Sequence, residues 1–135
     1  MQKLPRTAKV KILVILIGAF GLIVPLSSAL ANVVITEIMY HPVSDLDEDE
    51  FIELYNTSGT TVNLENWRMN GINYSFGSGA SIGPNAYLVL ARDANYFYAT
   101  YGFSPDYAYD INEGRLQNDG ETLQVIDAVC IHDQA

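Results

Sequence analysis

The sequence predicts an all-β fold, a β-sandwich with one short helix. About seven short segments rich in β-branched and aromatic residues follow one another between residues 32 and 127. Clusters of Gly, Asn, Ser and Pro separate these segments, as turns do between strands. One tryptophan, Trp67, lies near the middle of the chain, and many β-sandwiches bury a tryptophan between their sheets.

The first strand is expected at residues 32–40, where both alternating faces are largely apolar. Val34 and Ile38 fall on one of these faces, and we place Ile38 in the core. Pro42 ends the strand because proline cannot donate a backbone hydrogen bond to a neighbouring strand. A polar, acidic loop follows.

The second strand is expected at Phe51–Tyr55, with Leu54 pointing inward. A turn rich in Asn, Ser, Thr and Gly ends it. Further along, Asn70 and Gly71 form a dipeptide typical of a tight hairpin. The other strands are expected at Thr61–Leu64, Trp67–Met69, Ile72–Phe76, Ala86–Ala91, Tyr107–Tyr109 and Glu121–Asp127.

Two of the later strands differ in pattern. Ala86–Ala91 is continuously apolar, which favours a buried strand and places Leu88 in the core. Glu121–Asp127 alternates, so that Leu123 shares one face with Val125. The expected core residues are Trp67, Ile38, Leu54, Leu88 and Leu123.

A short helix is expected between Asp93 and Gly102. Asp93 is a good N-terminal cap, and glycine often follows the last helical residue. The helix is rich in aromatic residues, which favour either packing onto the core or a patch that stacks on carbohydrate or peptide. These aromatic residues are Tyr96, Phe97, Tyr98 and Tyr101.

Residues 1–31 are typical of a secretory signal helix. They carry four basic residues and no acidic one, followed by an apolar run from Ile12 to Leu26. Ala29 and Ala31 form an Ala-x-Ala cleavage signature, so we expect cleavage after Ala31 and secretion or display at the cell surface. If the segment is not cleaved, it would anchor the protein in the membrane.

The net charge of −9 hides two unlike parts. The leader carries +4, whereas residues 32–135 contain all 16 acidic residues, no lysine and three arginines, for a net charge of −13. Such an acidic domain lacks the basic surface that nucleic-acid binding requires. The charge would attract divalent cations or basic partners, and it counts against nucleic acid as a partner. We expect a protein or cell-envelope partner.

The acidic loop is the candidate metal site. Asp45, Asp47 and Asp49 alternate as ligands do in the first half of a calcium loop, and calcium prefers carboxylate oxygens. An EF-hand loop starting at Asp45 would require Gly at its sixth position and Glu at its twelfth, and the chain has Glu50 and Asn56 there. The alternative is a solvated acidic loop that binds no cofactor.

The sequence offers no catalytic set. Cys130 is the single cysteine, so no internal disulfide is possible. The chain has only two histidines, His41 and His132, and His132 lies in the last residues of the chain, after the final expected strand, so we expect no two-histidine metal site. The serines lack a nucleophile-elbow setting. We therefore expect a protein that is not an enzyme.

A series of motifs gives the chain its family resemblance. The motifs are Ile35–Tyr40, Glu50–Asn56, Val62–Leu64 with Trp67, Ile82–Pro84, Tyr87–Ala91 and Leu116–Glu121. In this order and spacing they resemble a lamin-tail domain over about residues 33–127. The resemblance implies an immunoglobulin-like sandwich without catalytic activity, used for tethering or recognition. The start of the domain is similar to bacterial exported forms that head spore-coat-kinase-type surface proteins.

The leading hypothesis is therefore an exported, non-catalytic module for surface attachment or for recognition of a protein or ligand. The alternatives are an accessory N-terminal domain of a larger secreted enzyme and a calcium-dependent binding module. Residues 128–135 depart from the family pattern because they contain no turn residue before a last strand. We expect domain 32–135 to be C-terminally truncated, with an exposed sheet edge.

Overall fold

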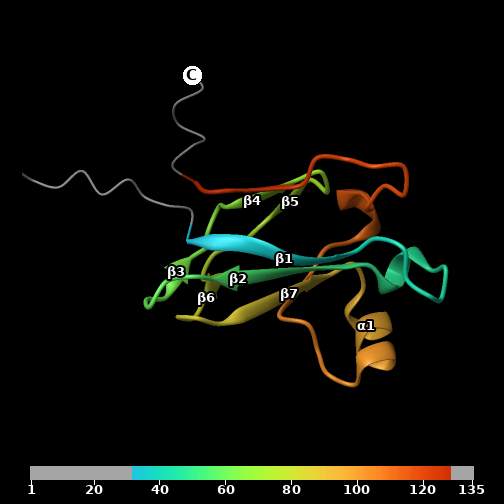
Figure 1. The fold of residues 1–135 in the computed structure, drawn as a ribbon, viewed down its shortest axis with the longest axis horizontal. Coiled ribbons are helices and arrows are strands. Elements are labelled where there is room, and N and C mark those ends of the chain that lie inside the picture. The colour runs from blue at the N-terminus through green and yellow to red at the C-terminus, as the bar shows by residue number, and fades with distance from the viewer. Residues whose placement is uncertain (1–31, 129–135) are drawn as a thin grey trace, which may run out of the picture.

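The structure, a computed structural model, describes residues 32–128. The leader, Cys130 and His132 lie outside these residues, and so does the chain end that was expected to lack a closing strand. The described strands form two facing layers with a small ribbon at the end away from the helix (Figure 1). The described residues form a mostly β sandwich with one α-helix, which confirms the predicted fold class.

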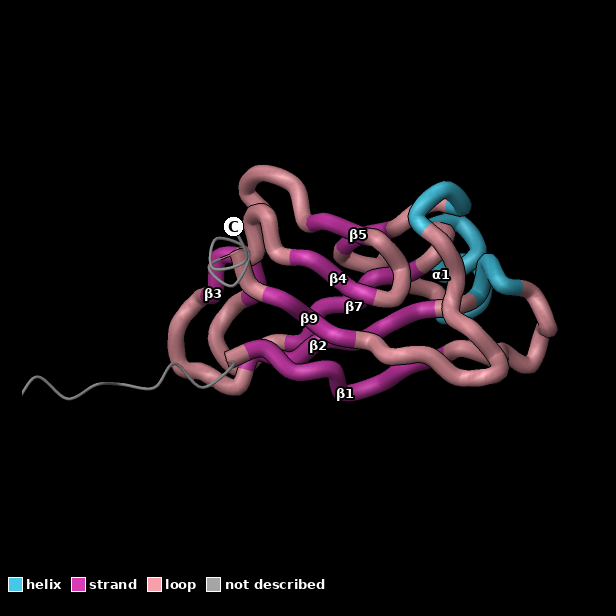
Figure 2. Tube along the Cα trace, turned by 90° about the horizontal axis from the view of Figure 1, so that it is seen from above, coloured by secondary structure: helices cyan, strands magenta, loops and turns pink. Residues whose placement is uncertain are grey.

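One layer is a four-stranded sheet in the order β1-β2-β7-β8, in which only β7 and β8 run parallel. The other layer is a three-stranded sheet, β5-β4-β9 (Figure 2), and the ribbon is β3-β6 (Figure 1). The strands are β1 (Val33–Met39), β2 (Phe51–Asn56), β3 (Val62–Asn63), β4 (Arg68–Asn70), β5 (Tyr74–Ser75), β6 (Ser81–Ile82), β7 (Tyr87–Ala91), β8 (Tyr107–Ala108) and β9 (Gln124–Ile126). The helical segments are η1 (Asp47–Asp49), α1 (Ala94–Tyr101) and η2 (Ile111–Glu113).

The helix α1 begins and ends at the residues that the sequence indicated. The carboxylate of Asp93 accepts hydrogen bonds from the backbone N–H groups of Asn95 (2.7 Å) and Tyr96 (3.1 Å). These bonds satisfy donors that have no partner within the first turn. Gly102 ends the helix with a φ of 80°, a left-handed conformation that glycine adopts without a steric penalty.

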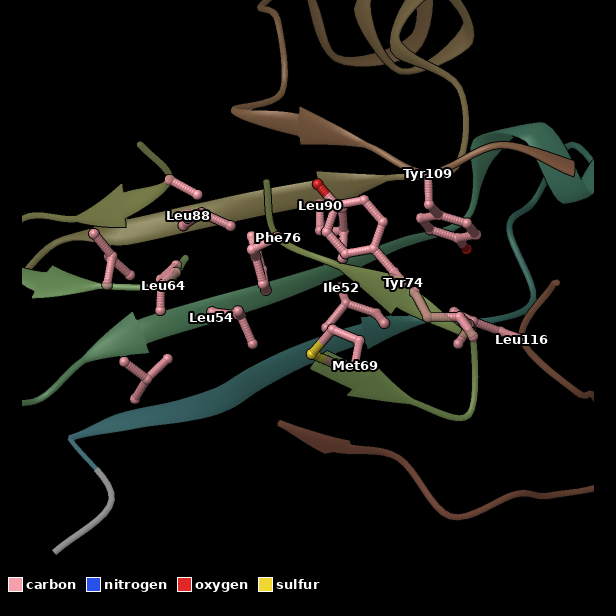
Figure 3. Close-up of a cluster of buried hydrophobic side chains, with 14 residues drawn as sticks. Ile52, Leu54, Leu64, Met69, Tyr74, Phe76, Leu88, Leu90, Tyr109 and Leu116 are labelled. Atoms are coloured by element: carbon pink, nitrogen blue, oxygen red, sulfur yellow. The ribbon is translucent and has the colours of Figure 1, made fainter. Parts of the chain in front are cut away.

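The core lies between the two layers (Figure 3). Leu54 and Leu88 pair in register on β2 and β7, and both are buried, as their apolar segments indicated. Leu123 is half-buried at the margin of this cluster. Trp67 is also only half-buried, because it follows the turn at Asn66 and packs against the edge of the core.

Ile38 is not a buried core residue, contrary to the sequence prediction. A bulge in β1 just after Ile35 shifts the pairing with β2, so that Ile35 pairs with Leu54 but Ile38 pairs with Ile52. The extra residue reverses the alternation, and Ile38 lies on the opposite face of the strand from Val34. Ile38 thus faces the core side, yet it remains 41% exposed because β1 is an edge strand in the described sheet.

The hairpin at Gly71 forms, but its turn is longer than the two residues predicted. Met69 pairs with Tyr74, so four residues connect the paired positions. Gly71 has a φ of 105°, and a Cβ atom there would lie 2.5 Å from Cδ2 of Leu123. Close approach of this turn to the segment before β9, together with burial of Ile72, explains the longer connection.

Asn56, at the end of β2, holds two loops together from a fully buried position. Its amide nitrogen donates to the carbonyl oxygens of Thr60 (2.7 Å), Ile82 (3.2 Å) and Gly83 (2.8 Å). Its amide oxygen accepts from the backbone N–H of Ser58 at 2.9 Å. Only an amide supplies donors and an acceptor in this arrangement, since a carboxylate has no hydrogen to donate.

We predict that Asn56→Asp destabilises the fold by about 3 kcal/mol or more, because a buried charge replaces the donors to three carbonyl groups. Asn63→Asp is the matched control: Asn63 is exposed, and its side-chain oxygen accepts from the backbone N–H of Glu65 at 2.9 Å, which a carboxylate also does. Urea unfolding of both variants measures the difference. Equal losses of unfolding free energy would contradict this role for Asn56.

Candidate functional site

An open groove lies beside the C-terminal end of β1, with a volume of about 390 Å³. Its apolar lining comes from Ile38, Tyr40, Leu116 and Leu123, and the turn at residues 117–121 forms its polar rim. Ile38 and Tyr40 are 41% and 49% exposed, so apolar surface is accessible there. A hollow with an apolar floor and a polar rim is typical of a site that receives an apolar group of a ligand.

The bulge in β1 places Ile38 in this groove. If β1 paired regularly, with no bulge after Ile35, strict alternation would put Ile38 on the same face as Val34, away from the core side. Bulges often redirect a side chain at the edge of a sheet. The groove therefore depends on a local irregularity of an edge strand.

A short turn forms the opposite wall of the groove. The backbone N–H of Gln117 donates to the Glu121 carboxylate at 2.8 Å, and the backbone N–H of Gly120 donates to the Gln117 carbonyl at 3.4 Å. Leu116 is buried and anchors the start of the turn in the core. These contacts give the groove a defined wall before any ligand arrives.

A buried carboxylate, that of Glu50, accepts a hydrogen bond from the residue that begins this wall. Glu50 is 1% exposed, and its Oε2 accepts hydrogen bonds from the backbone N–H of Leu116 (3.0 Å) and the hydroxyl of Tyr109 (3.3 Å). Nη1 of Arg92 lies 3.5 Å from the same oxygen, at ion-pair distance. Glu50 thereby links the start of β2 to the segment after β7 and to the groove wall.

Burial raises the pKa of Glu50 above 4.5, its usual value, and the nearby carboxylate of Asp47 raises it further. The Leu116 hydrogen bond, the charge of Arg92 and the Tyr109 hydroxyl act in the opposite direction but do not outweigh the burial. Burial also raises the pKa of Tyr109, and the charge of Glu50 adds to that rise. Both groups are enclosed, so this network supports the fold and offers no surface to a substrate.

Asp45, Asp47 and Asp49, the predicted calcium ligands, have different partners. Asp45 lies 3.3 Å from Nε2 of His41, and both side chains are exposed. Asp47 contacts Arg115 at 3.2 Å. Among residues 32–128, no group of three His, Cys, Asp or Glu residues is placed to hold a metal ion.

Asp49 has a structural role. It is buried, and its carboxylate accepts hydrogen bonds from the hydroxyls of Ser44 and Thr100, the latter at 2.9 Å. The Thr100 bond joins the acidic loop to α1. The loop therefore does not bring the three aspartates together, because each is drawn to a different neighbour.

The aromatic residues of α1 divide between packing onto the sheet and exposure to solvent. Phe97 is buried and meets the ring of Phe51 edge-on, with ring centroids 5.5 Å apart. Tyr101 stacks on Phe97 at 4.6 Å and remains partly exposed. Tyr96 and Tyr98 are exposed. The helix is thus fixed to the outer face of the four-stranded sheet by its phenylalanine, and tyrosines remain accessible.

The family model of the lamin tail domain matches residues 27–131. The chain belongs to the lamin tail domain family. This family consists of immunoglobulin-like modules that are non-catalytic and often act in binding. The match agrees with the two-layer sandwich described above.

No curated protein and no solved structure matches the chain significantly. Within residues 32–128, no helix has the length and apolar character needed to cross a membrane.

The sequence did not reveal the groove of this lamin tail domain. Its residues come from two segments about 80 positions apart, which a pattern along the chain does not connect. One available signal was the pair Ile38 and Tyr40, apolar residues next to a strand-ending proline. That signal acquires meaning only when the bulge and the opposite turn are known.

The Glu50 network predicts a pH dependence of stability. Because the pKa of Glu50 is higher in the folded state, the folded chain binds the proton more tightly. The resulting stabilisation is complete below the unfolded value of about 4.5 and is lost as the pH rises through the raised pKa.

We therefore expect the unfolding free energy of the wild type, relative to Glu50→Gln, to fall as the pH rises from about 4.5 towards neutrality. The glutamine variant removes this titration and retains an oxygen that accepts from Leu116. Urea unfolding of both proteins across the pH range measures the difference. A difference that is constant, or that grows with pH, would contradict the raised pKa.

Proposed function

We propose that this lamin tail domain is an exported, non-catalytic recognition module that attaches to a protein partner of the cell envelope or cell surface through the groove. The observation that supports this proposal is the accessible apolar lining of Ile38 and Tyr40 over the buried Leu116. Buried apolar area contributes about 25 cal/mol per Å², so an inserted apolar side chain would gain substantial affinity. The acidic side chains of Asp119 and Glu121 on the rim favour a neutral or basic partner segment.

Export is the second part of the proposal. The basic, apolar and small-residue order of residues 1–31 supports it, and cleavage after Ala31 would leave Asn32 and the whole of β1 intact. Val33, the first residue of β1, is only 1% exposed, so cleavage after Ala31 would retain the first buried residue of the described sheet.

Expression of the full chain in a bacterium with a general secretion pathway should yield an exported product that begins at Asn32, as determined by N-terminal sequencing. Replacing both small residues, Ala29→Tyr with Ala31→Tyr, should block cleavage and leave the longer chain attached to the membrane. Leu30→Ala changes the unconstrained middle position and serves as the control. An uncleaved wild-type chain, or cleavage of the tyrosine variant at the same bond, would contradict the proposed processing.

The groove is tested by binding of the full chain to envelope preparations of the source organism, quantified by co-sedimentation. The double variant Ile38→Ser with Tyr40→Ser should weaken binding about tenfold or more, since it removes the exposed apolar contacts of the site. The matched control, Tyr96→Ser with Tyr98→Ser, removes a similar exposed apolar area from α1.

Urea unfolding establishes that both double variants remain folded. The control should bind like the wild type. If the groove variant binds normally, or if the control weakens binding as much, the groove is not the attachment site.

A further inference from the structure

The outer face of the four-stranded sheet carries a second set of exposed and half-buried side chains, away from the groove. Val34, Tyr55 and Tyr87 lie in register across β1, β2 and β7. In an antiparallel sheet, side chains in register share a face, so these three form one row. Glu37 and Glu53 form the neighbouring row on the same face, and we refer to these five residues as the tyrosine–glutamate face.

The aromatic row is accessible and ordered by stacking. The rings of Tyr55 and Tyr87 lie with centroids 4.6 Å apart and a tilt of 38°. Tyr87 is 59% exposed and Val34 is 37% exposed, whereas Tyr55 between them is half-buried. The helix α1 covers a different end of this face, where Phe97 packs on Phe51.

The acidic row has an electrostatic cost in the isolated domain. Glu37 and Glu53 are directly opposite each other, and like charges at such positions destabilise a sheet. The hydroxyl of Thr36 donates to the Glu53 carboxylate at 2.7 Å, which adds a hydrogen bond but no positive charge. The negative charge of this row also acts on α1. The pKa of Tyr101 is raised mainly by burial, and the nearby carboxylates of Asp49 and Glu37 raise it further.

The arginines of the described chain are directed elsewhere. Arg92 and Arg115 form ion pairs with Asp47, and Arg92 also contacts Glu50. Arg68 lies on β4, in the opposite layer of the sandwich. Since residues 32–135 contain no lysine, the two glutamates have no cation in the described residues to neutralise them. A partner that carries positive charge would therefore meet two carboxylates that no described cation neutralises.

We propose that the tyrosine–glutamate face docks an arginine-bearing segment of a partner protein. A guanidinium group is planar, stacks on aromatic rings and forms paired hydrogen bonds with carboxylates, whereas an ammonium group does not stack in this way. The face offers stacked tyrosines directly beside two carboxylates. This inference rests on the proposed function of the domain as a recognition module, but it concerns a separate surface.

The probe is a short capped peptide of alternating arginine and glycine, titrated into the full chain by calorimetry at low salt. The matched lysine–glycine peptide and a β-linked glucose oligomer are the comparison ligands. We expect the arginine peptide to bind at least about threefold more tightly than the lysine peptide. We expect no binding of the sugar.

Two double variants test the face itself. Tyr55→Leu with Tyr87→Leu keeps apolar cover on the sheet but removes the aromatic rings, and it should weaken arginine-peptide binding about fivefold or more. Glu37→Gln with Glu53→Gln should weaken it to a similar extent and increase stability, because the opposed charges are gone. The control, Glu48→Gln with Glu65→Gln, makes the same change in net charge elsewhere and should alter binding by less than about twofold.

Three outcomes would overturn the proposal: no binding of the arginine peptide at millimolar concentration, equal weakening by the control variant, or preferential binding of the sugar. Equal weakening by the control would mean that only diffuse charge attracts the peptide. The groove variant Ile38→Ser with Tyr40→Ser should bind the arginine peptide like the wild type. Failure of this inference therefore leaves the groove proposal intact, and the reverse also holds.

Discussion

The described sandwich depends on the contacts that the buried carboxylate of Glu50 makes. This carboxylate accepts from the backbone of Leu116 and the hydroxyl of Tyr109 and lies at ion-pair distance from Arg92. These groups belong to segments that are far apart in the chain, and one side chain joins them at one end of the core. Removing one member of a buried, charged network leaves the others without compensation and is strongly destabilising. Because Leu116 begins the groove wall, the same carboxylate also holds the candidate site in shape.

The acidic residues of this lamin tail domain divide into two groups by burial. Asp49 and Glu50 are enclosed and satisfied by hydroxyl, backbone and guanidinium groups, so they act inside the fold. Glu37 and Glu53 lie on the outer face of the sheet, opposite each other and without a described cation. A net charge alone does not distinguish these groups. The distinction matters because only the outer pair is available to a partner, whereas the raised pKa of the buried Glu50 makes stability depend on pH.

Local signals in the sequence were sufficient for much of the fold. The cap at Asp93 and the stop at Gly102 lie within a few residues of the helix that they delimit, and the structure shows both. Leu54 and Leu88 were correctly placed inside, because Leu54 lies on the apolar face of an alternating strand and Leu88 lies in a continuously apolar one. The bulge in β1 has no clear signature in the sequence, so the pattern put Ile38 on the same face as Val34. Ile38 was expected in the core but remains 41% exposed, because β1 is an edge strand in the described sheet. The aspartates of the acidic loop were grouped by their spacing, yet their actual partners, such as Arg115 and Thr100, come from distant segments.

The sequence by itself determined the fold class, the family, most strand positions and the helix ends, because these depend on alternation, turn residues and caps within short stretches of chain. Tertiary structure alone decided which residues meet across the sandwich. It placed Ile38 beside Leu123 in one groove and Tyr55 beside Tyr87 on one face. Sheet register sets such neighbours, and register depends on long-range pairing and on a single inserted residue in β1. For that reason the candidate binding surfaces became visible only in the folded chain.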